Sequence, residues 1–189
     1  MKLLFSISAI SFSLDGWAQE HTEAENGPFN RQVNVETLPV PQEENQLFYL
    51  QRDPDENTIV YCLNIKNGEL NEDEPVQASW IRYTEGGTRK ELSFFQRKLA
   101  YGIHSKQLKN DQFELRLTAY KKILLTLCRC PKTEKFRAFT NINHKKAAVD
   151  RIFVRITGGS MLNPHIKYIE IAGTDYQTGQ KVSMRVLPL

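Results

Sequence analysis

The chain has 189 residues, of which 40% are hydrophobic, 25% charged and 10% aromatic, and this composition excludes global disorder, a collagen-like fibre and a disulfide-dense miniprotein. The net charge of +3 is unevenly distributed, with −10 over residues 19–76, +12 over residues 77–155 and +1 over residues 156–189. Such a layout is expected either where a basic surface meets an anionic partner or where an acidic segment lies across a basic one within the fold.

The first 18 residues have the pattern of a secretory signal peptide. Lys2 precedes an apolar, serine-containing run from Leu3 to Leu14, and Gly16 and Ala18 place small residues at the −3 and −1 positions of a cleavage site. The run is shorter than the roughly 20 apolar residues that a membrane-spanning helix needs, and no later segment approaches that length. The pattern predicts an exported protein, periplasmic or extracellular, with no transmembrane span in the mature chain.

Residues 19–45 are predicted to form an acidic extended arm or linker. This segment contains Pro28, Pro39 and Pro41 and shows no sustained apolar period of 2 or 3.6 residues. From residue 46 onward, short apolar runs alternate with turn-forming residues. We therefore expect residues 46–189 to form a single β-rich domain.

Nine segments of this domain have the composition and alternation of β-strands: Leu47–Arg52, Thr58–Lys66, Val76–Tyr83, Gln112–Ala119, Lys122–Cys130, Lys135–Asn143, Ala147–Thr157, His165–Gly173 and Lys181–Leu187. Turn-forming pairs follow the early strands: Asp53-Pro54, Asn67-Gly68 and Gly86-Gly87. Ile152, Val154 and Ile156 alternate with two arginines, which predicts one buried and one exposed face. The expected fold is mainly β, an antiparallel barrel or a two-sheet sandwich of about nine strands, because both limit exposed strand edges.

One segment, residues 88–104, has the period of a helix instead. Its apolar residues recur at the spacing of one helix face: Leu92, Phe95, Leu99, Ala100 and Ile103. A strand here would place bulky apolar side chains on both faces. We therefore predict one helix, near Arg89 to Tyr101, with Arg97 and Lys98 on its solvent side.

The sequence resembles the exported bacterial proteins called domain of unknown function 4833. The matching runs are Leu47–Arg52, Asn57–Tyr61, Trp80–Tyr83, Glu91–Ser93, Gln96–Lys98, Ala100–Gly102, Arg151–Val154 and Tyr168–Ile171 with Gly173. The resemblance extends from about residue 45 to residue 187. It implies one exported domain and no particular activity.

Three cysteines, Cys62, Cys128 and Cys130, are present. In an oxidising compartment Cys62 can pair with either of the other two, which point to the same face of a strand. Buried free thiols are the equally acceptable alternative. The single Cys-x-Cys pair has no second ligand cluster, so no metal site is predicted.

No catalytic or cofactor motif is present in the sequence. His104, His144 and His165 are scattered without metal-ligand spacing, no Gly-x-Ser-x-Gly occurs, and Gly86-Gly87 lacks the residues of a phosphate-binding loop. We therefore predict no catalytic residues, no metal and no cofactor. The alternative is a site assembled in space, such as Glu91 with His104.

The densest mixture of basic and aromatic residues lies between residues 80 and 104. The candidate ligand-binding residues are Trp80, Arg82, Arg97, Lys98 and Tyr101, because aromatic rings interleaved with cations can bind sugars, anionic lipids or single-stranded nucleic acid. Export argues against nucleic acid. The structural alternative is that the rings belong to the core and the cations form a solvated helix face.

These observations favour a non-catalytic binding or structural module of the cell envelope that recognises an apolar or anionic ligand. The alternative function is a hydrolase-type enzyme with a site assembled from loops. An apolar pocket with few polar groups would favour the binding module, whereas a histidine beside a carboxylate in a cleft would favour catalysis. The sequence does not indicate an oligomeric state.

The predicted leader leads to a direct test. Cleavage after Ala18 is expected, because Gly16 and Ala18 fit the small pockets of the signal peptidase, so the mature protein should start at Gln19. N-terminal sequencing of protein from the native cell envelope checks this. An intact chain starting at Met1, or protein found only in the cytoplasm, would contradict export.

Overall fold

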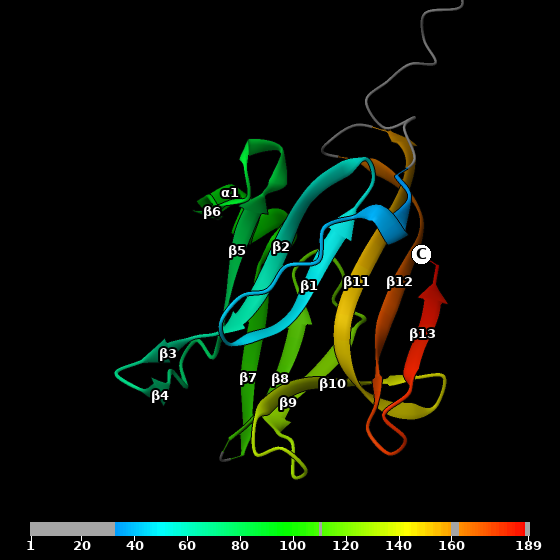
Figure 1. Cartoon of the computed structure of the whole chain (residues 1–189). Coiled ribbons are helices and arrows are strands. Elements are labelled where there is room, and N and C mark those ends of the chain that lie inside the picture. Colours follow the sequence, from blue (N-terminus) through cyan, green and yellow to red (C-terminus); the bar gives the residue numbers. More distant parts are fainter. Residues whose placement is uncertain (1–32, 110, 160–162, 188–189) are drawn as a thin grey trace, which may run out of the picture.

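Figure 1 shows the computed structural model, which describes residues 33–109, 111–159 and 163–187. Its strands are β1 (Gln46–Arg52), β2 (Asp55–Leu63), β3 (Ile65–Lys66), β4 (Glu69–Leu70), β5 (Val76–Arg82), β6 (Thr88–Glu91), β7 (Ile103–Lys109), β8 (Gln112–Leu117), β9 (Leu124–Arg129), β10 (Phe136–Ile142), β11 (Lys145–Gly159), β12 (Pro164–Asp175) and β13 (Lys181–Val186). Short helical turns are η1 (Val35–Thr37), η2 (Tyr83–Glu85), α1 (Phe94–Gln96) and the π-helical η3 (Arg97–Tyr101). Each of the nine predicted segments contains a strand, although the segment predicted at residues 58–66 is divided, since β2 ends at Leu63 and β3 belongs to a separate two-stranded sheet, and the fold is mainly β.

Apart from the short β3–β4 hairpin, the strands form one large curled sheet. Its main path runs β6-β5-β2-β1-β11-β10-β9-β8-β7, and β12 and β13 extend from β11. One ladder differs from the antiparallel expectation, because β1 pairs with β11 in parallel, from Tyr49 opposite Arg151 to Arg52 opposite Val154. The other ladders of the described residues are antiparallel.

The long strand β11 is shared between the two halves of the sheet. Its first residues pair with β10, its later residues pair with β1, and β12 follows its opposite edge over nearly its whole length. Two strands of different direction on the same edge force the sheet to fork and curl, and the result is a half-barrel (Figure 1). These ladders form neither the closed barrel nor the two-sheet sandwich that the sequence led us to expect.

The main hydrophobic core fills the concave side of the half-barrel. Phe48 of β1 stacks on Tyr61 of β2 with ring centroids 4.6 Å apart, and both side chains are fully buried. The core continues into β8, β9 and β11, where Phe113, Leu125 and Ile152 are buried. Alternate residues of β1 and β2 point to the other face, where Tyr49, Val60, Cys62 and Ile81 form a second, smaller cluster.

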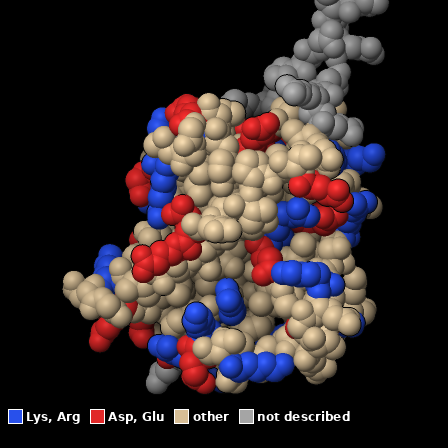
Figure 2. All heavy atoms as spheres, in the orientation of Figure 1, with Lys and Arg blue, Asp and Glu red and all other residues tan. Residues whose placement is uncertain are grey.

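Residues 33–45, which we call the N-terminal segment, lie across that outer face (Figure 1). The Gln51 side chain donates a hydrogen bond of 2.7 Å to the carbonyl of Pro39, and Arg89 pairs with Glu43 at 3.1 Å. The acidic part of the chain is thus joined to the basic part within the fold, and Figure 2 shows acidic and basic side chains interspersed on this face of the molecule. Residues 19–32 of the predicted arm, and the predicted leader, lie outside the described residues.

The helix is shorter than the one that the spacing of apolar residues predicted near Arg89 to Tyr101. Residues 88–91 form β6, which pairs with β5 after the Gly86-Gly87 turn, where both glycines have positive φ angles of 73° and 76°. The helical segment, residues 94–101, begins after a capping box in which Ser93 and Gln96 bond reciprocally. It ends at Gly102, whose missing side chain lets the Arg97 carbonyl oxygen approach closely.

The apolar stripe of this segment does not form one core-facing side. Leu92 is buried, but Phe95 is 71% exposed and Leu99 is 63% exposed. The expectation that Phe95 and Leu99 pack in the core is therefore wrong. Leu92 precedes the N-cap residue Ser93 and therefore lies outside the helical segment, whereas Phe95 and Leu99, one turn apart on the same side of that segment, are both exposed to solvent.

Two strands of the sheet were not expected, β6 and β7. All residues of β6, and all of β7 after Ile103, are exposed. Without a buried face, neither strand has the alternating pattern that reveals a strand in sequence. No helix among the described residues has both the length and the apolar character needed to cross a membrane.

A buried carboxylate joins the first hairpin to β11. Asp53, in the turn between β1 and β2, is fully buried and pairs with Arg155 at 3.0 Å. Its two oxygens also accept the backbone N–H groups of Val33 at 3.1 Å and Ile156 at 3.2 Å. One side chain thereby fixes the N-terminal segment, the β1–β2 turn and β11 relative to one another.

We expect Asp53→Asn to lower the free energy of unfolding by about 3–5 kcal/mol, because it leaves the Arg155 guanidinium buried without its counter-ion. Asp111→Asn is the matched control, since the Asp111–Arg129 pair is about half exposed on both sides and such pairs contribute about 0–1 kcal/mol. Urea denaturation measures both. Equal, small effects of the two substitutions would contradict the structural role of Asp53.

Candidate functional site

The helical segment separates two hollows of the molecule. On one side lies the outer cleft, of about 320 Å³, lined by Asn64, Glu74, Val76, Gln77, Ala78, Glu91, Phe94, Arg97, Lys98, Gly102, Ile103, His104 and Thr118. On the other side lies the apolar cavity, of about 310 Å³, lined by Leu50, Arg52, Leu99, Ala100, Tyr101, Leu117, Ala119, Tyr120, Ile123, Ile152, Val154, Ile156, Pro164, Ile166 and Ile169. The two sites differ in chemistry, and each contains some of the residues singled out in the sequence.

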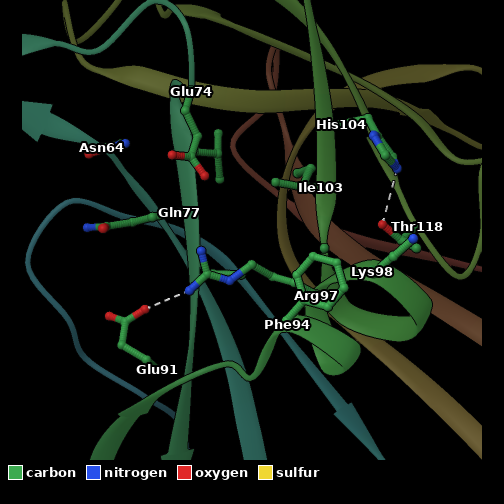
Figure 3. Close-up of a pocket in the computed structure, with 13 residues that line it drawn as sticks. Asn64, Glu74, Gln77, Glu91, Phe94, Arg97, Lys98, Ile103, His104 and Thr118 are labelled. Carbon is green, nitrogen blue, oxygen red and sulfur yellow. Dashed lines mark hydrogen bonds and ion pairs between the residues drawn. The ribbon is translucent and has the colours of Figure 1, made fainter.

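Two pairs of polar side chains contact each other in the outer cleft (Figure 3). Arg97 turns toward Glu91 and pairs with it at 2.9 Å, and His104 turns toward the Thr118 hydroxyl at 3.3 Å. Glu91 and His104 therefore do not form the acid–base pair considered from the sequence. Among the described residues, no histidine has a carboxylate as hydrogen-bond or ion-pair partner.

The candidate cations Arg97 and Lys98 lie on this outer side. Arg97 also donates to the Leu92 carbonyl at 3.4 Å, so its charge is held by its own local structure. The Lys98 ammonium lies 5.5 Å from the centre of the Phe94 ring. Of these two cations, Lys98 is the one with no acidic partner among the described residues.

The other three candidates, Trp80, Arg82 and Tyr101, form a separate group. The Trp80 and Tyr101 rings are 6.4 Å apart and tilted by 44°, and the Arg82 guanidinium lies 5.3 Å from the Trp80 ring. Arg82 also pairs with Glu85 at 2.6 Å. The structure thus splits the five predicted residues into two groups, one on each side of the helical segment.

Tyr101 links this aromatic group to the apolar cavity, because its ring lines the cavity wall. The buried Tyr61 hydroxyl donates a 3.0 Å hydrogen bond to the Tyr101 carbonyl, which anchors the end of the helical segment to the core. Burial raises the pKa of Tyr101, and the nearby Arg52 guanidinium partly opposes that shift. At neutral pH the Tyr101 hydroxyl is therefore protonated.

The walls of the apolar cavity come from β1, the helical segment, the end of β8 with its connection to β9, β11 and β12. Arg52, the last residue of β1, is the one charged residue among the described residues that line it. Its guanidinium lies 5.4 Å from the centre of the Tyr101 ring. The alternation of Ile152, Val154 and Ile156 was visible in the sequence, but a cavity wall and a filled core produce the same alternation. No sequence pattern identified Arg52 as a residue of a site.

The three cysteines are free thiols. Cys62 lies on β2 and Cys128 on β9, separated in the sheet by β1, β11 and β10, so the bridges considered from the sequence are not formed. Burial raises the pKa of Cys62 to about 11, whereas a hydrogen bond from Thr133 lowers the pKa of Cys130. Within the described part of the chain, no three His, Cys, Asp or Glu side chains are grouped as metal ligands.

Comparison with known proteins places this half-barrel in a family. Residues 48–185 match the family described as Domain of unknown function (DUF4833), which covers almost all of the sheet. The chain belongs to this family, as its resemblance to it indicated. No curated protein and no solved structure matches the chain.

We expect Tyr61→Phe to lower the free energy of unfolding by about 1 kcal/mol, because the Tyr101 carbonyl loses its buried donor. The end of the helical segment should also open more often, so the Gly102 amide, which donates to Arg97, should exchange with solvent faster. Hydrogen exchange measures this. Tyr49→Phe, on the outer face of the same sheet, should leave the exchange of Gly102 unchanged, and equal effects would contradict the anchoring role.

Proposed function

We propose that this protein is an exported, non-catalytic binding module of the cell envelope, and that its ligand occupies the apolar cavity. The observation that supports this most directly is the lining, which, as far as the described residues form it, is apolar apart from Arg52 and the hydroxyl groups of Tyr101 and Tyr120. Small-molecule sites are typically concave, mostly apolar and supplied with a few polar groups. The cavity has these properties.

The architecture supports the same proposal. The sheet is not closed into a barrel, since β6 and β7 at the two ends of its main path do not pair with each other, and the helical segment contributes Leu99, Ala100 and Tyr101 to the lining of the cavity. We infer that the working form is a barrel left incomplete on this side, rather than a two-sheet sandwich, because a second sheet packed over the cavity would cover the exposed Leu99 and the half-buried Val154 and Ile166. The incomplete closure leaves space for an apolar ligand.

An apolar ligand is better supported than a purely anionic partner at the surface. Of the cations predicted to form a basic face, Arg97 pairs with Glu91 and Arg82 pairs with Glu85. Arg89, from the same basic part of the chain, pairs with Glu43. Paired surface charges attract an external anion only weakly after screening by salt.

The hydrolase alternative has less support. Catalysis of that kind needs a base within hydrogen-bond reach of a nucleophile or water and oriented by a third group. In the outer cleft the contact of His104 is with Thr118, and no carboxylate orients the imidazole among the described side chains. We therefore assign the alternative no residues.

Binding to the cavity is tested with a neutral apolar dye, N-phenyl-1-naphthylamine, whose fluorescence rises in apolar surroundings. Ala119 is exposed at the cavity mouth, so Ala119→Trp should fill the mouth without disturbing the core and should raise the dissociation constant at least ~tenfold. Lys121→Trp is the matched control, because this residue is exposed in the same connection and does not line the cavity.

The control variant should bind the dye as the unmodified protein does. If the unmodified protein does not bind the dye, or if Ala119→Trp binds it as tightly as Lys121→Trp does, the cavity is not a binding site. Circular dichroism of both variants verifies that the fold is retained.

A further inference from the structure

Arg52 is the unusual residue of the apolar cavity. Its guanidinium makes no hydrogen bond or ion pair with another residue in the described parts of the chain, although its side chain is half-buried. By contrast, Arg155, on the neighbouring strand, is paired with Asp53 at 3.0 Å. The Arg52 nitrogens are not among the buried polar atoms that lack a partner in the described residues, so water reaches them, and an anion that enters the cavity can replace this water as their acceptor.

The surroundings of Arg52 leave its charge available. Asp55, opposite Arg52 in the β1–β2 hairpin, lines the same crevice, and its carboxylate accepts the backbone N–H of Asn57 at 2.8 Å and does not form an ion pair with Arg52. The Tyr101 ring, 5.4 Å away, supports one face of the guanidinium. No described residue forms a hydrogen bond or ion pair at the edge of the guanidinium, where its N–H donors lie, so a ligand in the cavity can accept from them.

The volume of the cavity limits the size of the apolar part that an anionic ligand can carry. A volume of about 310 Å³ lies at the small end of the range of small-molecule sites, roughly 300–1,000 Å³. That space accepts one medium-length alkyl chain and excludes the two chains of a phospholipid. The accessible part of the apolar lining, which includes Leu99, Val154 and Ile166, would contact this chain.

We propose that the ligand is a single-chain amphiphile with a carboxylate head group, and that Arg52 binds that head group. The planar guanidinium matches a carboxylate with two parallel hydrogen bonds. One unit of positive charge, with Asp55 close by, balances a monoanion better than the doubly charged head of a phosphate monoester. This inference rests on the proposed function, since it assumes that the cavity is the binding site.

The test compares three probes that share a ten-carbon chain, namely decanoate, decanol and decyl phosphate, by isothermal titration calorimetry on the full chain at pH 7. Decanoate should bind at least ~tenfold more tightly than decanol, because a charge-assisted hydrogen bond forms only with the acid. Decyl phosphate should bind no more tightly than decanoate. The comparison needs no variant, so it does not depend on how any substitution folds.

Arg52→Gln should reduce decanoate affinity to that of decanol while leaving decanol affinity and N-phenyl-1-naphthylamine binding unchanged. Arg116→Gln is the matched control, because Arg116 lies on β8 and pairs with Glu114 away from the cavity, and it should keep the decanoate preference. Retained dye binding in Arg52→Gln shows that the cavity itself is intact.

The outcomes separate the two proposals. If the dye and decanol bind but decanoate binds no better, or if its advantage survives Arg52→Gln, the carboxylate inference is wrong while the binding module stands. Tighter binding of decyl phosphate than of decanoate also overturns the carboxylate assignment. If neither the dye nor any ten-carbon probe binds, the proposed function itself fails.

Discussion

The parallel pairing of β1 with β11 is the constraint on which the rest of the structure depends. Because β10 occupies the first part of the same edge of β11, the sheet cannot continue flat and instead divides into two arms that curl around a shared core. The buried pair of Asp53 with Arg155 holds the end of this ladder in place. The apolar cavity lies beside the ladder, between Leu50 on β1 and Ile152 on β11.

The strands of the fold could be predicted from sequence because their signals are local. Alternation such as that of Ile152, Val154 and Ile156, together with turn pairs such as Asn67-Gly68, is contained within a few residues. The parallel ladder is not local, since its partners are far apart in the chain and no alternation indicates strand direction. The short helical segment was overestimated because exposed Phe95 and Leu99 have the same spacing as core residues.

The candidate site could be predicted only in part. Trp80, Arg82 and Tyr101 do lie together, since β5 and the end of the helical segment meet at one place. Arg52 and the cavity could not be found, because the lining residues come from five separate parts of the chain and each resembles an ordinary core position. An empty volume depends on how strands curl in space, which short-range sequence patterns do not contain.

The parallel ladder also determines the order in which the sheet can be completed during synthesis. Strands β1, β2, β5 and β6 are neighbours in both sequence and sheet, so they can pair soon after they leave the ribosome. The free edge of β1, however, has no partner until residues 151–154 of β11 have been made. For most of translation this nascent chain therefore exposes an unpaired strand edge next to the apolar side chains of Phe48 and Leu50, and an edge of that kind can pair with other chains.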